Sequence, residues 1–161
     1  MLLLKNLLFT FVIPGTVAVY VPLRVARWQG RTPCDGVRFP LAIAAFAVGG
    51  GIYLWCVWDF ATVGRGTPAP IDAPKRLVVR GLYRYTRNPM YVGVLLVIVG
   101  WAAWFASRWL LLYAAGVATL FHLFVVGYEE PHLRRVFGAE YEAYCARVSR
   151  WIPHFSRVRK D

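Results

Sequence analysis

The stretch "RNPMYVG", from Arg87 to Gly93, combines residues that can start a helix with residues that can hold a ligand. Asn88 is a favoured N-cap and Pro89 is a favoured first helical residue, so the pair predicts a helix that begins here. Free N–H groups and the dipole at such a start attract an anion, and Arg87 beside them can bind a carboxylate through two hydrogen bonds. Tyr91 follows one turn inside the predicted helix. Gly93 either leaves room for a flat ligand or packs against the last apolar helix, predicted over residues 109–127.

The stretch "GYEEPHL" places two neighbouring carboxylates, Glu129 and Glu130, at the predicted C-terminal end of another helix. Negative charges oppose the helix dipole there, each at a cost of roughly a few tenths of a kcal/mol. Either loop arginines pair with these acids at the membrane surface, or one acid binds a cationic group of a ligand. His122 lies two turns earlier on nearly the same face of this helix. It is either a functional group or a neutral side chain that is hydrogen-bonded to another helix.

We expect these two stretches to lie at the same end of an antiparallel helical hairpin. Two apolar runs lie between them, and only Ser107 and Arg108 separate these runs. A guanidinium and a positive helix start would then face a carboxylate pair across a pocket. Such a pocket suits a zwitterion, for example an amino acid moiety that carries both an ammonium and a carboxylate.

The composition indicates that the chain is surrounded by lipid rather than by water. Of its 161 residues, 58% are hydrophobic and 16% aromatic, and the mean hydropathy is +0.48. A net charge of +11 would suggest nucleic acid in a soluble protein, but here the basic residues lie in loops and tails between apolar runs. We therefore expect a membrane partner and no nucleic acid. Cys34, Cys56 and Cys145 are too far apart for a disulfide framework or a metal site.

Four apolar runs predict an all-α, polytopic membrane protein with about four transmembrane helices. They cover residues 6–23, 39–60, 90–106 and 109–127. A signal peptide is the alternative for the first run, but no small-residue cleavage site precedes Arg24. Gly49-Gly50-Gly51 either allows close helix packing or marks a break in the second helix. From Pro131 onward the chain is amphipathic, and we expect two short interfacial helices divided at Gly138.

The distribution of basic residues predicts the orientation in the membrane. The loop before the hairpin carries six Lys or Arg and the tail after it seven, against Arg108 alone at the tip. The open ends of the hairpin should therefore face the cytoplasm, with both termini on that side. Arg24, Arg27, Arg31 and Arg38 oppose this assignment, because they would lie outside. Either one of the first two runs is not a simple crossing, or the hairpin dominates the orientation.

Three longer features together resemble a known family: "GLYRYTRNPMYVG", the two-helix hairpin, and "EEPHLRRVFGAEYEAYCARVSRWIP". They resemble the integral membrane methyltransferases of the isoprenylcysteine carboxyl methyltransferase and phospholipid methyltransferase type. The resemblance covers residues 75–153, about half of the chain, and depends on the order and spacing of the motifs. Asn88 stands where that family usually has His. An amide can form hydrogen bonds there but cannot transfer a proton as an imidazole does.

The resemblance implies S-adenosylmethionine as cofactor and a lipid-borne or isoprenoid acceptor that enters from the bilayer. By position it implies cofactor-binding roles for Gly81, Leu82, Tyr83, Arg87, Asn88, Pro89, Tyr91, Gly93, His122, Glu129 and Glu130. Arg87, Tyr91 and Glu130 are the catalytic candidates, and an amine acceptor would need Glu130 or His122 as a base. The implied organisation is a single membrane domain over 1–161: two N-terminal spans (1–60), a cytoplasmic loop that covers the cofactor (61–89), the transmembrane hairpin (90–127) and cytoplasmic interfacial helices (128–161).

Two other functions are compatible with the same pattern. Membrane sterol reductases that use a nicotinamide cofactor share a basic cytoplasmic loop and a C-terminal hairpin. A non-catalytic membrane adaptor would use its Glu and Arg residues only as interfacial anchors. The compact arrangement from "RNPMYVG" to the Glu pair favours the methyltransferases.

Overall fold

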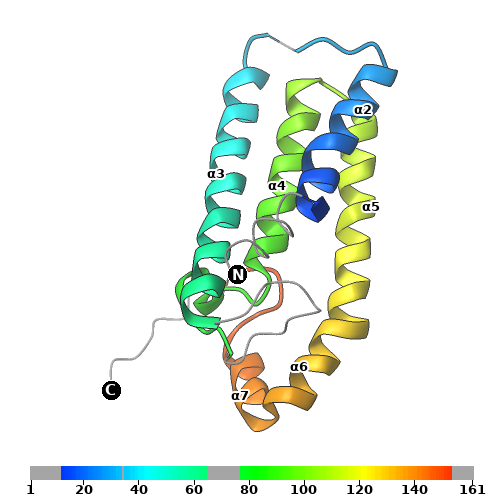
Figure 1. Ribbon diagram of the computed structural model, residues 1–161. Coiled ribbons are helices and arrows are strands. Elements are labelled where there is room, and N and C mark those ends of the chain that lie inside the picture. Colours follow the sequence, from blue (N-terminus) through cyan, green and yellow to red (C-terminus); the bar gives the residue numbers. More distant parts are fainter. Residues whose placement is uncertain (1–11, 34, 65–76, 154–161) are drawn as a thin grey trace.

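The computed structural model describes residues 12–33, 35–64 and 77–153, and every regular element in these ranges is helical (Figure 1). The all-α prediction is therefore confirmed for the described residues. Three long helices run side by side: α3 (Arg38–Asp59), α4 (Pro89–Trp104) and α5 (Arg108–Phe124). Their bounds follow the predicted runs closely, because Pro89 and Ser107 mark helix starts in the sequence.

Glycines bring α3 and α4 into close contact. A Cβ on Gly49 of α3 would lie 2.7 Å from the carbonyl oxygen of Gly93, and a Cβ on Gly93 would lie 2.8 Å from that of Gly49. Gly100, further along α4, is covered in the same way by Phe46. The helix α3 continues through its three glycines without a break, so the packing alternative holds for this segment.

The helices α4 and α5 form the expected antiparallel hairpin (Figure 1). Its tip is closed by Ser107, whose side chain accepts a hydrogen bond from the Leu110 N–H and donates one to Gln29 Oε1 at 2.9 Å. Gln29 follows α2 (Val21–Trp28), which continues a π-helical turn at Thr16–Tyr20. This N-terminal helix packs on the hairpin, and Trp101 Nε1 donates to the Ala18 carbonyl at 2.9 Å.

Two helical stretches of the described chain are long and apolar enough to cross a membrane, by length and composition. They are Arg38–Thr62 and Arg108–Phe137, and Pro89–Trp104 is apolar but shorter. The predicted first run, 6–23, begins outside the described residues. The count of four spans and the orientation in the membrane thus remain predictions.

The chain after α5 differs from the prediction that a helix ends at residue 127. It continues through a π-helical turn at Val125–Glu129 into α6 (Glu130–Phe137), so Glu129 and Glu130 do not lie at a helix C-terminus. Pro131 has no N–H to donate within an α-helix. The wider π-helical turn just before it allows the helix to continue past this missing hydrogen bond. Gly138, with φ of +51°, then separates α6 from α7 (Ala139–Arg147), as predicted.

Candidate functional site

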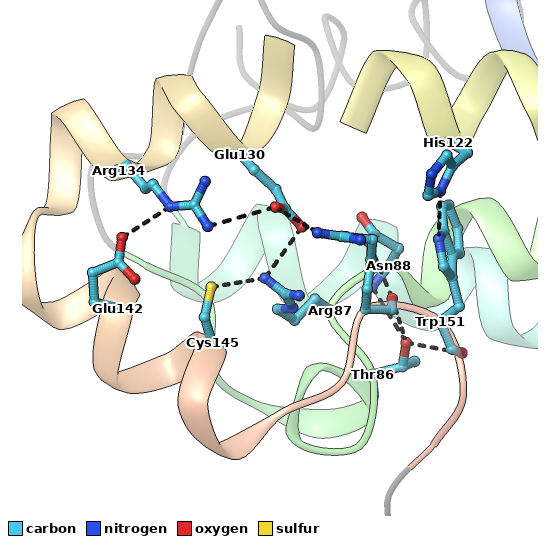
Figure 2. A network of polar contacts seen from close by, with 10 residues as sticks. Thr86, Arg87, Asn88, His122, Glu130, Arg134, Glu142, Cys145 and Trp151 are labelled. Carbon is cyan, nitrogen blue, oxygen red and sulfur yellow. Dashed lines mark hydrogen bonds and ion pairs between the residues drawn. The ribbon is translucent and has the colours of Figure 1, made fainter. Parts of the chain in front are cut away.

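Glu130 lies at the centre of a cluster of guanidinium groups (Figure 2). Arg150 holds it with two hydrogen bonds, from Nε to Oε1 at 2.6 Å and from Nη2 to Oε2 at 3.0 Å. Arg87 Nη1 lies 3.1 Å from Oε1, and Arg134 Nη2 lies 3.8 Å from Oε2. Because Glu130 is only 3% exposed, these cations replace the water that the carboxylate has lost. Of the two acids expected to form ion pairs with arginines, Glu130 therefore does so.

Arg87 links the start of α4 to α7. Besides Glu130, its Nη1 contacts the Cys145 sulfur at 2.7 Å. Its Nε is buried and has no hydrogen-bond partner in the described part of the chain. Arg87 thus holds the predicted position beside the helix start, with one donor still available to an acceptor group.

Glu129 has different surroundings from its neighbour. Its Oε2 accepts a hydrogen bond of 2.8 Å from the Tyr91 hydroxyl, which comes from the first turn of α4. Among the described residues, no Lys or Arg lies within ion-pair distance of Glu129. The two stretches predicted to meet do meet, and Glu129 is the carboxylate that lacks a cationic partner there.

Asn88 occupies the N-cap position of α4, but its side chain does not cap the helix. Its Nδ2 instead donates to the Arg150 carbonyl at 3.1 Å. Thr86 Oγ1 donates to the same carbonyl at 3.0 Å, and the Arg87 N–H donates to the Ser149 carbonyl at 2.9 Å. Residues 149–151 therefore form a C-terminal strap that is tied to the segment before α4 (Figure 2).

Trp151 of the C-terminal strap connects the strap with the hairpin. Its Nε1 donates to His122 Nδ1 at 3.2 Å, and its ring lies 6.4 Å from that of Tyr91. The Tyr91 ring also contacts Phe121 at a centroid distance of 4.7 Å. His122 is thus hydrogen-bonded, as one alternative expected, but to the strap and not to another helix.

The remaining candidates lie on both sides of the start of α4. Gly81, Leu82 and Tyr83 belong to a 3₁₀ turn, Gly81–Arg84. Burial raises the pKa of Tyr83 well above its ordinary value, and the nearby Cys56 and Glu129 raise it further. The carbonyl of Tyr83 accepts a 2.7 Å hydrogen bond from the Tyr144 hydroxyl, so α7 anchors this turn. Gly93 faces Gly49 of α3, not the fourth helix, and its role here is close packing.

Several residues of this region were not among the sequence candidates. The sequence places Arg150 and Trp151 only in an amphipathic tail, and it assigns Cys145 to no site. Asp59 lies at the end of a predicted apolar run, where an acidic residue in a membrane helix is itself a signal of function. Lys75 and Arg76 of the predicted covering loop lie outside the described residues.

The chain is similar to proteins of known sequence over much of its length. A model of the phospholipid methyltransferase family matches residues 37–140. Methanethiol S-methyltransferase 1 of Bradyrhizobium diazoefficiens is 38% identical over 80 residues, which are 50% of this chain but only 27% of that protein. An uncharacterised protein of Haemophilus influenzae is 30% identical over 63 residues, which are 39% of this chain and 100% of that one. No solved structure matches the chain significantly.

The residues matched by the family model include both sides of the site. They begin just before α3 and extend into α7, so they contain Arg87, Tyr91, Glu129 and Glu130. The chain belongs to the phospholipid methyltransferase family.

Proposed function

We propose that the protein transfers a methyl group from S-adenosylmethionine to a hydrophobic or lipid-borne acceptor at the cytoplasmic face of a membrane. The observation that carries this proposal is the difference between the two adjacent acids. Glu130 is neutralised by three arginines, whereas Glu129 has only the neutral phenol of Tyr91 among its described hydrogen-bond and ion-pair partners. A half-buried carboxylate of this kind is a suitable partner for a cationic group of a ligand.

The available groups fit the methionine part of S-adenosylmethionine, which carries an ammonium, a carboxylate and a sulfonium. Glu129 can hold the ammonium. The buried Nε of Arg87 and the positive start of α4 can receive the carboxylate. Tyr91 orients Glu129 through its hydroxyl, and Glu130 acts indirectly, because it fixes Arg87 and Arg150.

When bound, S-adenosylmethionine supplies an electrophilic methyl group on sulfur. The protein's contribution is then mainly to position the reactants in line and to exclude water, and orientation alone can account for about 7–11 kcal/mol of the barrier. The ring of Tyr91, which hydrogen-bonds Glu129, packs against Phe121 and lies near Trp151, and this aromatic surface can help to exclude water. A lipid-borne acceptor would enter sideways between helices.

The surroundings of the two candidate bases favour an acceptor that arrives as an anion. Glu130 is held as a carboxylate by three guanidinium groups, so it binds a proton poorly. His122 Nδ1 already accepts a hydrogen bond from Trp151, so this nitrogen is not free to take a proton from an acceptor. A carboxylate is already ionised near neutral pH and needs no proton removal by the protein, whereas an ammonium must lose a proton before it can accept a methyl group. The name of the Bradyrhizobium relative indicates a thiol acceptor for that protein, and a thiol would have to enter this site as the thiolate, with its proton left to water.

Calorimetric titration of the purified protein in detergent with S-adenosylmethionine tests the cofactor assignment. Glu129→Gln should lower the affinity at least about tenfold, because it removes the only charge opposite the ammonium. Glu142→Gln is the matched control, since Glu142 is exposed and, among the described residues, pairs with Arg134 alone; it should bind as the wild type does. An unchanged affinity of Glu129→Gln would reject Glu129 as the ammonium partner.

The same titrations separate the other candidate functions. Tight binding of a reduced nicotinamide without binding of the sulfonium would establish a reductase. Binding of neither cofactor would favour a non-catalytic adaptor. Methylation of a lipid extract, an isoprenylated cysteine, phosphatidylethanolamine and a small thiol with labelled cofactor, followed by mass spectrometry, identifies the acceptor. Labelling of the amine lipid alone would contradict the preference for an anionic acceptor.

A further inference from the structure

One buried acid outside the cluster around Glu130 has an unsatisfied oxygen. Asp59 lies at the C-terminal end of α3 and is 2% exposed. Its Oδ2 is buried and has no hydrogen-bond partner in the described part of the chain. Buried carboxylate oxygens are almost always hydrogen-bonded, because an unpaired one costs free energy. A ligand that donates a hydrogen bond would explain why none of the described residues pairs with this oxygen.

Gly81 brings the 3₁₀ turn directly against this acid. Its φ of +56° favours glycine, and a Cβ at this position would collide with Asp59 Oδ2 and lie 2.8 Å from Trp55 Nε1. The two polar atoms therefore border the same small region beside the Gly81 backbone. One of them is a hydrogen-bond acceptor and the other a donor.

Tyr83 connects this region with Glu129. A side-chain hydrogen bond joins its hydroxyl to the Cys56 thiol, one helical turn before Asp59 on α3. Tyr83 is also near Glu129, whose charge raises the tyrosine pKa further. Asp59 and Glu129 therefore both lie near the same buried tyrosine, so one extended ligand could reach both.

We infer that Asp59 and Trp55 together bind a hydroxyl group of the ribose of the cofactor. A hydroxyl can donate to Asp59 Oδ2 and accept from Trp55 Nε1 at the same time. An ammonium only donates, and it would leave the indole N–H facing a cation. A phosphate only accepts, and the carboxylate would repel it. The inference rests on the proposed function, since it places the nucleoside of S-adenosylmethionine beyond Tyr83 from the methionine part.

Calorimetry with two ligands tests the assignment through binding and not through turnover. The ligands are S-adenosylhomocysteine and its 2′,3′-dideoxy analogue, and the variants are Asp59→Asn and Trp55→Phe. Asp59→Asn should weaken S-adenosylhomocysteine about tenfold and Trp55→Phe a few-fold, because each loses a hydrogen bond to the hydroxyl. Neither variant should change the affinity for the dideoxy analogue. Asp35→Asn, an exposed acid near the opposite end of α3, is the control and should bind both ligands as the wild type does.

Thermal unfolding without ligand provides a second readout, in which Asp59→Asn should not weaken the protein although it weakens binding. If Asp59 is kept for a ligand, Asp59→Asn should unfold at the same temperature as the wild type or higher, because it removes an unsatisfied buried charge. A lower unfolding temperature together with equal losses of affinity for both ligands would show that Asp59 is structural, and would overturn the inference. If the wild type binds S-adenosylhomocysteine and Asp59→Asn binds it equally well, the inference about Asp59 is overturned but the proposed function is not. No wild-type binding at all would reject both.

Discussion

Glu129 and Glu130 are adjacent and chemically identical, yet their surroundings differ. Glu130 is enclosed by Arg87, Arg134 and Arg150, which surround its carboxylate with positive charge. Glu129 accepts a hydrogen bond from Tyr91, and among the described residues no Lys or Arg forms an ion pair with it. The π-helical turn that ends at Glu129 lies directly between the two surroundings, at a type of helix irregularity that is frequent in functional sites.

The burial of the ion pairs around Glu130 predicts unequal effects of two Glu→Gln substitutions on stability. Glu130→Gln should lower the free energy of unfolding by about 2–3 kcal/mol, because it leaves the half-buried Arg87 without its counter-charge. Glu142→Gln, in an exposed pair with Arg134, should change it by less than about 0.5 kcal/mol. Denaturant unfolding of both variants in the same detergent measures the difference. Equal effects would mean that the buried cluster contributes no more than a surface ion pair.

Tyr91 should affect binding more than stability. Tyr91→Phe removes the hydrogen bond to Glu129 but keeps the ring contact with Phe121. We expect a decrease of about three- to tenfold in affinity for S-adenosylmethionine, since one hydrogen bond to a charged group is lost. Phe121→Leu, which alters the ring contact and leaves the hydrogen bond in place, is the comparison. A larger loss of affinity for Phe121→Leu than for Tyr91→Phe would show that the aromatic contact matters more.

The sequence predicted which segments meet at this site better than it predicted the ion pairs and hydrogen bonds that their side chains form. "RNPMYVG" and the Glu pair could be found because motif spacing and an antiparallel hairpin bring them together. Arg150 could not be found, since its pairing with Glu130 depends on a turn at Gly138 and on the path of the chain after α7. For the same reason, the sequence could not tell which of the two acids lacks a cation.

At the scale of helices, the contact between α3 and α4 depends on the absence of side chains at two facing positions. Gly49 and Gly93 let the two backbones approach each other directly, and this contact positions the start of α4 relative to the end of α3. The long apolar runs, together with Asn88 and Pro89 at the start of α4, predicted these helices well. The π-helical turns were not predicted, because they preserve the apolar pattern; two of them are followed closely by a proline, at Pro22 and Pro131.

Alanine at two glycines of α3 should therefore have opposite effects. Gly49→Ala should destabilise the protein by about 1–3 kcal/mol, because its Cβ would clash with the Gly93 backbone, which cannot move aside easily. Gly51→Ala has no atom within 4 Å of the added Cβ and should be neutral or stabilising by up to about 1 kcal/mol. Thermal unfolding compares the two. Equal stability of both variants would mean that α3 and α4 are not in close contact.

For the whole molecule, arginines gather at both ends of the helical bundle. The hairpin tip, α2 and the start of α3 share one end, where Arg24, Arg27, Arg31, Arg38 and Arg108 lie (Figure 1). The other end carries the site with Arg87, Arg134 and Arg150, and also Arg80, Arg84, Arg135 and Arg147. The difference in basic residues between the described ends is small, so orientation needs a direct measurement.

The proposed orientation predicts which positions a membrane-impermeant thiol reagent can reach. In a protein whose native cysteines are replaced by alanine, Asp35→Cys should be labelled in intact cells, and Glu140→Cys only in inverted vesicles. Both positions are exposed and lie at opposite ends of the bundle. The reverse pattern would place the site on the outer face, and equal labelling of both positions in intact cells would argue against a membrane-crossing bundle.

The pairing of the C-terminal strap with the segment before α4 has a consequence for synthesis. Chains emerge from the ribosome N-terminus first, so Thr86 and Asn88 are made well before Ser149 and Arg150. The hairpin can enter the lipid bilayer before Arg150 exists to hold Glu130. Ligand-binding competence should therefore arise only once Ser149 and Arg150 have been made, after the membrane helices are already in place.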